Sequence, residues 1–240
     1  MSAPDPDLAA LLAATLAGLV RDSRTVAVGS NSPIPAAAAL LAAHKAPGRL
    51  TVSILGSTRH NPFTDGGREL FDFAAQGRLD SFFLGGGQID GNGNVNLVRA
   101  GDQRFPGSYG SAYLMALVPN IVLFREEHSR RVLVPKVDFI SARGSGPEGT
   151  YRTEGPRSLV TGRAVFRFED GRFVLASHHP GETVETIRTH TGFDFALCAG
   201  VPTTLDPSAE DLRLLRGPIA DELAPLYPRF VSRLLRGSHA

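Results

Sequence analysis

Short β-prone runs alternate with helix-like segments along the first half of this chain, and this alternation constrains the fold more than any other feature. The runs end in glycine- or proline-containing turns, and the segments between them carry apolar residues at helical spacing. The predicted strands are 25–28, 50–55 and 81–84, and the predicted helices are 8–20, 34–44 and 67–76. Because such alternation is typical of βαβ units, we expect an open α/β fold with a mostly parallel sheet and helices on both faces.

The second half of the chain continues this pattern and then changes character. A helix at 111–118 and strands at 120–124, 131–134 and 137–140 extend the predicted sheet. Beyond Arg143 we expect a small antiparallel part, in which 159–168 and 172–177 form a hairpin about Glu169-Asp170-Gly171. The last predicted helices are 182–190, stopped by Gly192, and 208–216. We therefore expect one domain over residues 1–200 and a C-terminal arm, 201–240, suited to packing on a partner subunit.

Composition narrows the function classes. Lys and Arg number 25 against 24 Asp and Glu, so no basic field attracts nucleic acid. The single cysteine, Cys198, excludes an intrachain disulfide and a cysteine-based zinc cluster, which favours a reducing, cytoplasmic location. The apolar stretch Leu8 to Val20 is too short to span a bilayer, so we expect no membrane association.

The most distinctive segment, residues 82–96, is a hydrophobic run that breaks into Gly85-Gly86-Gly87-Gln88 and then a turn rich in Asn and Gly. Because glycine lacks a Cβ, the triplet is expected to reach positive φ and to let an oxyanion or phosphate approach its N–H groups. The alternative is an ordinary strand-to-hairpin turn with Asn92-Gly93 at its tip, since Asn-Gly is a strong hairpin signal.

Motifs of several common enzyme classes are absent from the sequence. It contains no Gly-x-Ser-x-Gly elbow, Walker loop or His-Glu-x-x-His pair. Residues 144–149 match Gly-x-Gly-x-x-Gly, but Pro147 interrupts the motif and no helix is expected after it, so we exclude a dinucleotide site. His178-His179 lacks complementary metal ligands at suitable spacing, and we interpret 126–128 as a solvated strand end.

Several motifs, in order along residues 8–200, carry a resemblance to a known family. Together they resemble the β subunit of class I CoA-transferases, of the glutaconate and 3-oxoacid branches. The motifs are Val28-Gly29 with Pro33, Leu55-Gly56-Ser57, 85–96, 105–110, 136–140 and His179-Pro180-Gly181.

The resemblance implies an obligate assembly with an α subunit and a CoA thioester as substrate, with no metal and no bound cofactor. In that family a β-subunit glutamate attacks the acyl-CoA carbonyl, which gives an acyl anhydride and then a glutamyl-CoA thioester. Ser57 stands nearest to that glutamate here, and residues 55–60 contain no carboxylate. Arg59 and His60 are the polar side chains that would replace its function.

The resemblance also assigns candidate site residues. Gly86, Gly87 and Gln88 are expected to donate hydrogen bonds to the thioester oxyanion. Substrate or CoA contacts are expected at the same carboxyl edge of the sheet. Those candidates are Asn31, Arg59, His60, Gly85, Asp90, Ser108 and Gly110.

Three functions remain open. The first is CoA transfer between an acyl-CoA and a carboxylic acid. The second is ring-opening hydrolysis of a CoA thioester, as in a CoA-transferase-like branch that opens steroid-derived rings with the working glutamate on the α subunit. The third is a non-catalytic acyl-CoA-binding subunit. The missing carboxylate near Ser57 is the feature that separates the first from the second.

Overall fold

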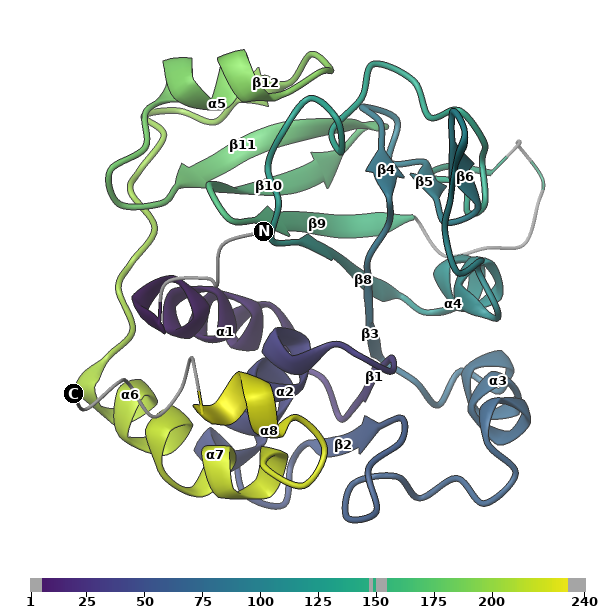
Figure 1. Cartoon of the computed structure of the whole chain (residues 1–240), viewed down its shortest axis with the longest axis vertical. Helices are drawn as coiled ribbons and strands as arrows, with labels where there is room; N and C mark the ends of the chain where they lie inside the picture. Colours follow the sequence, from purple (N-terminus) through teal and green to yellow (C-terminus); the bar gives the residue numbers. More distant parts are fainter. Residues whose placement is uncertain (1–5, 147–148, 150–154, 233–240) are drawn as a thin grey trace. The chain divides into compact units, whose positions relative to one another are not determined.

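The computed structural model describes residues 6–146, 149 and 155–232 (Figure 1). The chain forms two compact units, one from residues 1–64 with 205–240 and the other from residues 65–204. The second boundary lies close to the predicted start of the C-terminal arm. The first boundary, after residue 64, was not predicted from the sequence.

The first unit begins with a helix–strand–helix–strand series, as predicted. The elements are α1 (Pro6–Val20), β1 (Thr25–Val28), α2 (Pro33–Lys45) and β2 (Thr51–Ile54). Strands β1 and β2 pair in parallel, with Thr25 opposite Thr51 and Val28 opposite Ile54. Pro6 and Pro33 open their helices, where the missing proline N–H leaves no helical hydrogen bond unmade. Helix α2 is buried from Ile34 to Ala42, and α1 packs against it.

The C-terminal segment of the first unit is more helical than expected. It contains α6 (Ala209–Arg216), α7 (Pro218–Leu223) and α8 (Pro228–Phe230), whereas the sequence predicted only the first of these. Ser208 and Asp211 form a capping box that starts α6. Both α6 and α7 pack against α2 of the same chain. The segment therefore covers the chain's own helical layer.

The second unit is built on a mixed sheet with strand order β12–β11–β10–β9–β8–β3. Strand β8 pairs in parallel with both β3 and β9, β10 pairs antiparallel with both β9 and β11, and β12 is parallel to β11. The strands are β3 (Ser81–Leu84), β8 (Asn120–Arg125), β9 (Pro156–Thr161), β10 (Ala164–Glu169), β11 (Arg172–His178) and β12 (Ala196–Leu197). The predicted combination of parallel pairing and a small antiparallel part is confirmed.

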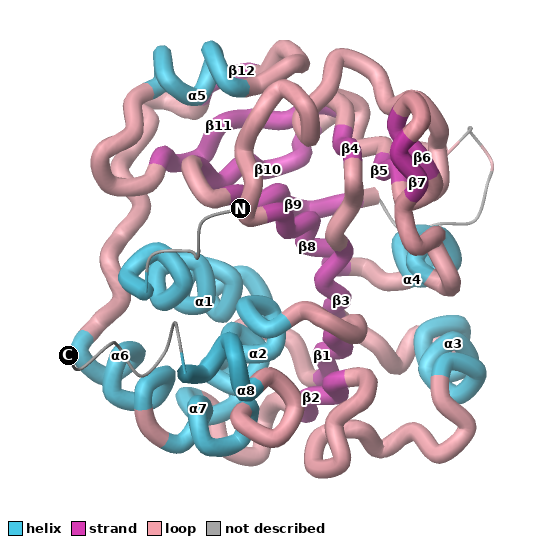
Figure 2. The backbone as a smooth tube through the Cα atoms, in the orientation of Figure 1, coloured by secondary structure: helices cyan, strands magenta, loops and turns pink. Residues whose placement is uncertain are grey.

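Within the described residues, two short hairpins and three helices complete this unit. Figure 2 colours the strands magenta and the helices cyan. One hairpin pairs β4 with β5, and the other pairs β6 with β7. Helices α3 and α4 pack together, and α4 also contacts β3. The bounds are β4 (Gln88–Ile89), β5 (Val95–Asn96), β6 (Arg99–Ala100), β7 (Gln103–Arg104), α3 (Gly67–Ala75), α4 (Ser111–Leu117) and α5 (Val184–His190).

Phenylalanines fill the core beside the antiparallel strands. Phe166 contacts the rings of Phe173, Phe193 and Phe195 at centroid distances of 5.3–6.4 Å. Phe166 and Phe173 are fully buried. These edge-to-face contacts join β10 and β11 to the segment after α5, and they stabilise the antiparallel part beyond simple burial.

Three predicted strands of this unit, at 131–134, 137–140 and 159–168, were wrong. Residues 131–134 and 137–140 form no strands, because only Leu133 bridges the two-residue strand β4, at Ile89, and Pro135 follows at once. The single strand predicted over 159–168 is two strands, β9 and β10, that reverse at Gly162-Arg163. Residues 147–148 and 150–154, which include most of the segment judged unable to form a dinucleotide-binding helix, lie outside the described residues.

Candidate functional site

The glycine triplet leaves β3 at the carboxyl edge of the parallel strands. None of Gly85, Gly86 and Gly87 has a positive φ, so the expected left-handed backbone is wrong for this triplet. Close packing explains two of the glycines instead: a Cβ at Gly86 would collide with Val95, and one at Gly87 would overlap the ring of Phe105. The triplet is therefore shaped by contacts within the protein.

The hairpin after the triplet agrees with the alternative interpretation. Strands β4 and β5 pair Gln88 with Asn96, and the loop closes with Gly93 at φ 72°. The N–H of Gly87 donates to the carbonyl of Asn96 at 2.8 Å, so this amide is engaged within the hairpin. The N–H of Gly86, in contrast, has no hydrogen-bond partner in the described part of the chain.

Gln88 is buried and held by one end of its amide. Its Oε1 accepts hydrogen bonds from Nδ2 of Asn96 at 2.7 Å and from the N–H of Asp138 at 3.0 Å. The Nε2 donor has no partner among the described residues. Because two contacts orient the carbonyl end, the amino group of Gln88 points in a set direction with both hydrogens available.

Asp90 serves the hairpin itself. Oδ1 accepts from the N–H groups of Asn92 and Asn94, and Oδ2 accepts from the side chain of Asn94 and the N–H of Val137. The carboxylate is 2% exposed and fully used. The expected ligand contact of Asp90 is therefore not supported, and the residue acts as the organiser of an Asx turn.

Two charged residues that sequence reasoning did not select lie at the same edge of this sheet. Arg125 ends β8, the strand that pairs with β3, and its buried Nε has no partner among the described residues. Its terminal nitrogen lies 3.7 Å from a Glu127 carboxylate oxygen. Burial raises the pKa of the adjacent Glu126, while the charge of Arg125 lowers it. The only sequence signal for Arg125 and Glu126 is their position at the end of a buried strand.

His128, from the segment interpreted as a solvated strand end, is 6% exposed, so that interpretation was wrong. Its two ring nitrogens contact the hydroxyls of Thr161 and Thr191 at 2.7 and 2.9 Å. Burial lowers its pKa from 6.5 to about 4, with the charges of Arg163 and His190 adding to the effect. His128 is therefore a neutral, fully paired core residue.

In the first unit, Ser57 lies in the tight turn after β2. Its Oγ accepts hydrogen bonds from the N–H groups of Arg59 at 3.2 Å and His60 at 3.0 Å. The N–H of Ile54 donates to the carbonyl of His60, which closes the turn. The Ser57 hydroxyl thus stabilises backbone, while the Arg59 side chain is exposed.

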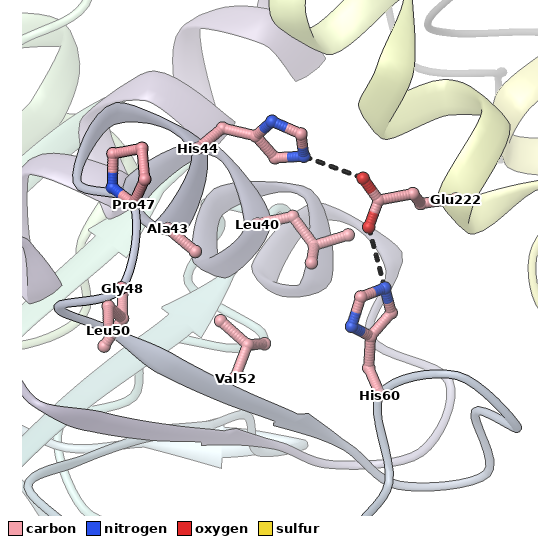
Figure 3. Close-up of a pocket in the computed structure, with 9 residues that line it drawn as sticks. All are labelled: Leu40, Ala43, His44, Pro47, Gly48, Leu50, Val52, His60 and Glu222. Carbon is pink, nitrogen blue, oxygen red and sulfur yellow. Dashed lines mark hydrogen bonds and ion pairs between the residues drawn. The ribbon is translucent and has the colours of Figure 1, made fainter.

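The ring of His60 turns toward the C-terminal segment of the same unit. Nε2 of His60 lies 2.8 Å from one carboxylate oxygen of Glu222, and Nε2 of His44 lies 2.7 Å from the other (Figure 3). Sequence reasoning missed both His44 and Glu222, because Glu222 is more than 160 residues away from either histidine.

The remaining candidates are turn residues. Asn31 is exposed and adopts φ 55°, a left-handed conformation that asparagine tolerates. The carbonyl of Ser108 accepts from the N–H of Ser111 at the start of α4, and Gly110 is buried where a Cβ would overlap the ring of Phe71. Their expected ligand contacts stay predictions, as does that of the exposed Gly85.

Within the described ranges, no group of three or more His, Cys, Asp or Glu side chains is arranged to hold a metal ion. His179 instead contacts the Thr161 carbonyl and the Thr204 hydroxyl. A helix with the length and apolarity needed to cross a membrane is likewise not found among these residues.

Comparison with known proteins decides the family. A sequence model described as coenzyme A transferase matches residues 9–190. This chain belongs to the coenzyme A transferase family. Among curated relatives, the B subunit of the 3-oxoadipate CoA-transferase of Pseudomonas knackmussii is 31% identical over 162 residues, and the cholesterol ring-cleaving hydrolase IpdB subunit of Rhodococcus jostii is 32% identical over 160 residues. Each match spans 62% of this chain and 62% of the relative.

Solved structures show the same fold. Rhodococcus jostii IpdAB superimposes with a TM-score of 0.78 at 25% identity, over 95% of this chain and 98% of that one. The decarboxylase AibA/AibB gives a TM-score of 0.75 at 24% identity, over 96% of this chain and 99% of that one, which bears on the fold alone. The resemblance and the fold class expected from the sequence are both confirmed.

Proposed function

We propose that this chain is the β subunit of a two-component enzyme of the coenzyme A transferase family that acts on an acyl-CoA thioester, moving CoA between it and a carboxylic acid. The observation that carries the proposal is a pair of donors that follow β3 and have no hydrogen-bond partners among the described residues. These are the unpartnered N–H of Gly86 and the oriented Nε2 of Gln88, both within the described part of the chain.

Such donors suit the chemistry of a thioester. When a nucleophile attacks the carbonyl carbon, negative charge develops on the oxygen, and donors already in place stabilise it without rearrangement. One donor of this kind contributes about 3–4 kcal/mol of transition-state stabilisation. Gly87 is left out of this set because its N–H is bonded to Asn96.

Arg125 adds a positive charge at the same edge of the sheet as these donors. Its buried Nε lacks a partner among the described residues, so a ligand carboxylate or oxyanion would satisfy it. Glu126, beside it, is a candidate for proton transfer because burial raises its pKa.

The enzyme needs an α subunit. The 3-oxoadipate CoA-transferase relative is named as a B subunit, the other relative is named as the IpdB subunit, and one solved neighbour is IpdAB, which supports a hetero-oligomer. We propose no metal and no tightly bound cofactor, since coenzyme A enters as part of the substrate. We also propose a cytoplasmic location, because a chain with a single cysteine suits a reducing compartment.

A second candidate function, hydrolytic ring opening of a CoA thioester, is favoured by the absence of a carboxylate around Ser57. The turn from Leu55 to His60 offers no carboxylate, and the Ser57 hydroxyl already accepts two backbone hydrogen bonds. A covalent acyl anhydride needs a carboxylate nucleophile. The similarity to the IpdB subunit points the same way.

Product analysis separates the two candidates. The chain is co-expressed with an α subunit and incubated with a panel of acyl-CoAs, with and without free carboxylic acids, and the products are analysed by mass spectrometry. A new CoA thioester that appears only with added acid establishes transfer. A gain of one water with the thioester intact establishes hydrolysis. If every thioester stays unchanged, a non-catalytic subunit remains and the proposal fails.

A further inference from the structure

A pocket of about 340 Å³ opens within the first unit, between helix α2, strand β2 and helix α7 (Figure 3). Its walls are mostly apolar, and its polar groups are confined to two histidines and one carboxylate. Its lining includes Leu40, Leu50, Val52, His44, His60 and Glu222. This volume lies at the lower end of the range of small-molecule sites, and the apolar lining is typical of them.

Glu222 determines how its two histidines present themselves. Each of its carboxylate oxygens faces one Nε2, that of His44 at 2.7 Å and that of His60 at 2.8 Å. The Glu222 side chain is 9% exposed, so little water competes for these contacts. The His44 contact is a hydrogen bond, whereas Nε2 of His60 lies close to its carboxylate oxygen without hydrogen-bond geometry. A bare ring nitrogen at either distance would set two lone pairs against each other, so both histidines carry hydrogen on Nε2. In the neutral ring Nδ1 is then an acceptor.

The two Nδ1 atoms face different surroundings. Figure 3 shows Nδ1 of His60 directed toward the side of Val52 and Leu40, whereas Nδ1 of His44 is directed away from the apolar wall. Nδ1 of His60 has no hydrogen-bond partner among the described residues. The pocket therefore contains one oriented acceptor that this part of the protein leaves unused.

We propose that this pocket binds a small, neutral, largely apolar molecule that carries one hydrogen-bond donor, such as an alcohol, with Nδ1 of His60 as the acceptor. An anion would be repelled by the Glu222 carboxylate. A cation would have to displace a histidine, because both carboxylate oxygens are occupied. The apolar wall of Leu40, Leu50 and Val52 selects a compact hydrocarbon body. None of these residues belongs to the donors proposed for the acyl-CoA chemistry.

The test uses the full-length chain and two probes of equal size, cyclohexanol and cyclohexanone. Both are small enough to enter the pocket, but only the alcohol donates a hydrogen bond. Binding is followed at pH 8 by NMR shifts of the His60 ring and by calorimetry. We expect cyclohexanol to bind about tenfold more tightly than cyclohexanone, the ratio that one additional hydrogen bond commonly gives.

Two matched variants locate the acceptor. His60→Phe keeps the ring volume and removes the pocket-facing nitrogen, so the preference for the alcohol should disappear. His44→Phe also removes one contact with Glu222 but retains Nδ1 of His60, so the preference should persist. Equal affinities of the wild-type chain for both probes, or no binding of cyclohexanol up to its solubility limit, would overturn the proposal without bearing on the acyl-CoA chemistry. These two results need no variant to fold.

Discussion

Nδ2 of Asn96 donates to Oε1 of Gln88 at 2.7 Å, across the first pair of the β4–β5 hairpin. Both side chains are buried, and the contact leaves the amino group of Gln88 available. The hairpin therefore does more than reverse the chain. It orients the donor on which the proposed function depends.

Replacing Asn96 should loosen this hairpin. Besides Gln88, the Asn96 side chain bonds the carbonyl and N–H of Arg99 and the N–H of Val98. Asn96→Leu leaves these groups unpaired, so we expect the free energy of unfolding to fall by about 2–3 kcal/mol. Urea denaturation measures this loss. Asn92→Ala, at the exposed tip of the same hairpin, is the control and should change stability by less than about 0.5 kcal/mol.

The packing of Phe105 on Gly87 gives a steric prediction. Gly87→Ala places a methyl group inside the volume of the Phe105 ring, so stability should fall by about 1–3 kcal/mol. Phe105→Leu should recover part of that loss in the double variant. Gly18→Ala, in α1 with open space around it, should instead stabilise by about 0.5–1 kcal/mol. If the stability changes of Gly87→Ala and Phe105→Leu simply add in the double variant, the contact between these two residues is contradicted.

Stability should depend on His128 between pH 6.5 and 4. The unfolded chain takes up a proton on this ring near pH 6.5, but burial lowers the folded pKa to about 4. The stabilisation is therefore complete above pH 6.5 and is lost as the pH falls toward 4, by up to about 3 kcal/mol. Burial lowers the pKa of His179 too, so both rings contribute with the same sign.

His128→Leu isolates this effect. Thr161 and Thr191 keep the carbonyls of Ala164 and Ile187 as partners, so the substitution leaves neither hydroxyl unpaired. The slope of unfolding free energy against pH, measured by denaturation at several pH values, should become shallower. An unchanged slope would show that His128 is not the group responsible.

Ser57 should prove to be a turn residue. Ser57→Ala removes the acceptor for the N–H groups of Arg59 and His60, so we expect a loss of about 1 kcal/mol in stability. Turnover by the assembled enzyme should change by less than an order of magnitude, because removing a true covalent nucleophile lowers kcat far more. Steady-state kinetics of the variant complex make the comparison. A collapse of kcat in a folded complex would restore Ser57 as a nucleophile.

Local patterns predicted much of this fold and less of the site. The runs at 25–28 and 81–84 became strands at their predicted bounds, and Asp170-Gly171 closes the hairpin of β10 and β11, because glycine turns and apolar runs act over a few residues. The burial of His128 depends on Thr161 and Thr191, which lie 33 and 63 residues away. Such distant contacts leave no periodic signal.

The same limit applies to the carboxylate between the two histidines. Glu222 lies in a helix that was not predicted, and it reaches His44 across 178 residues. The glycine triplet shows the opposite problem. Its sequence permits positive φ, but the actual requirement is space for Val95 and Phe105, which only the packed structure reveals.

The kinetics of Gln88→Met test the central claim most directly. Methionine keeps the approximate shape of the side chain and removes the Nε2 donor, but it also removes the Oε1 that accepts from Asn96 and from the N–H of Asp138. Kinetics are therefore compared only for variant complex that assembles with its α subunit, as judged by size-exclusion chromatography. We expect kcat on the acyl-CoA substrate to fall by about 10²–10³-fold, the usual effect of losing one oxyanion donor. An assembled Gln88→Met enzyme with the kcat of the wild type would contradict the role assigned to this site.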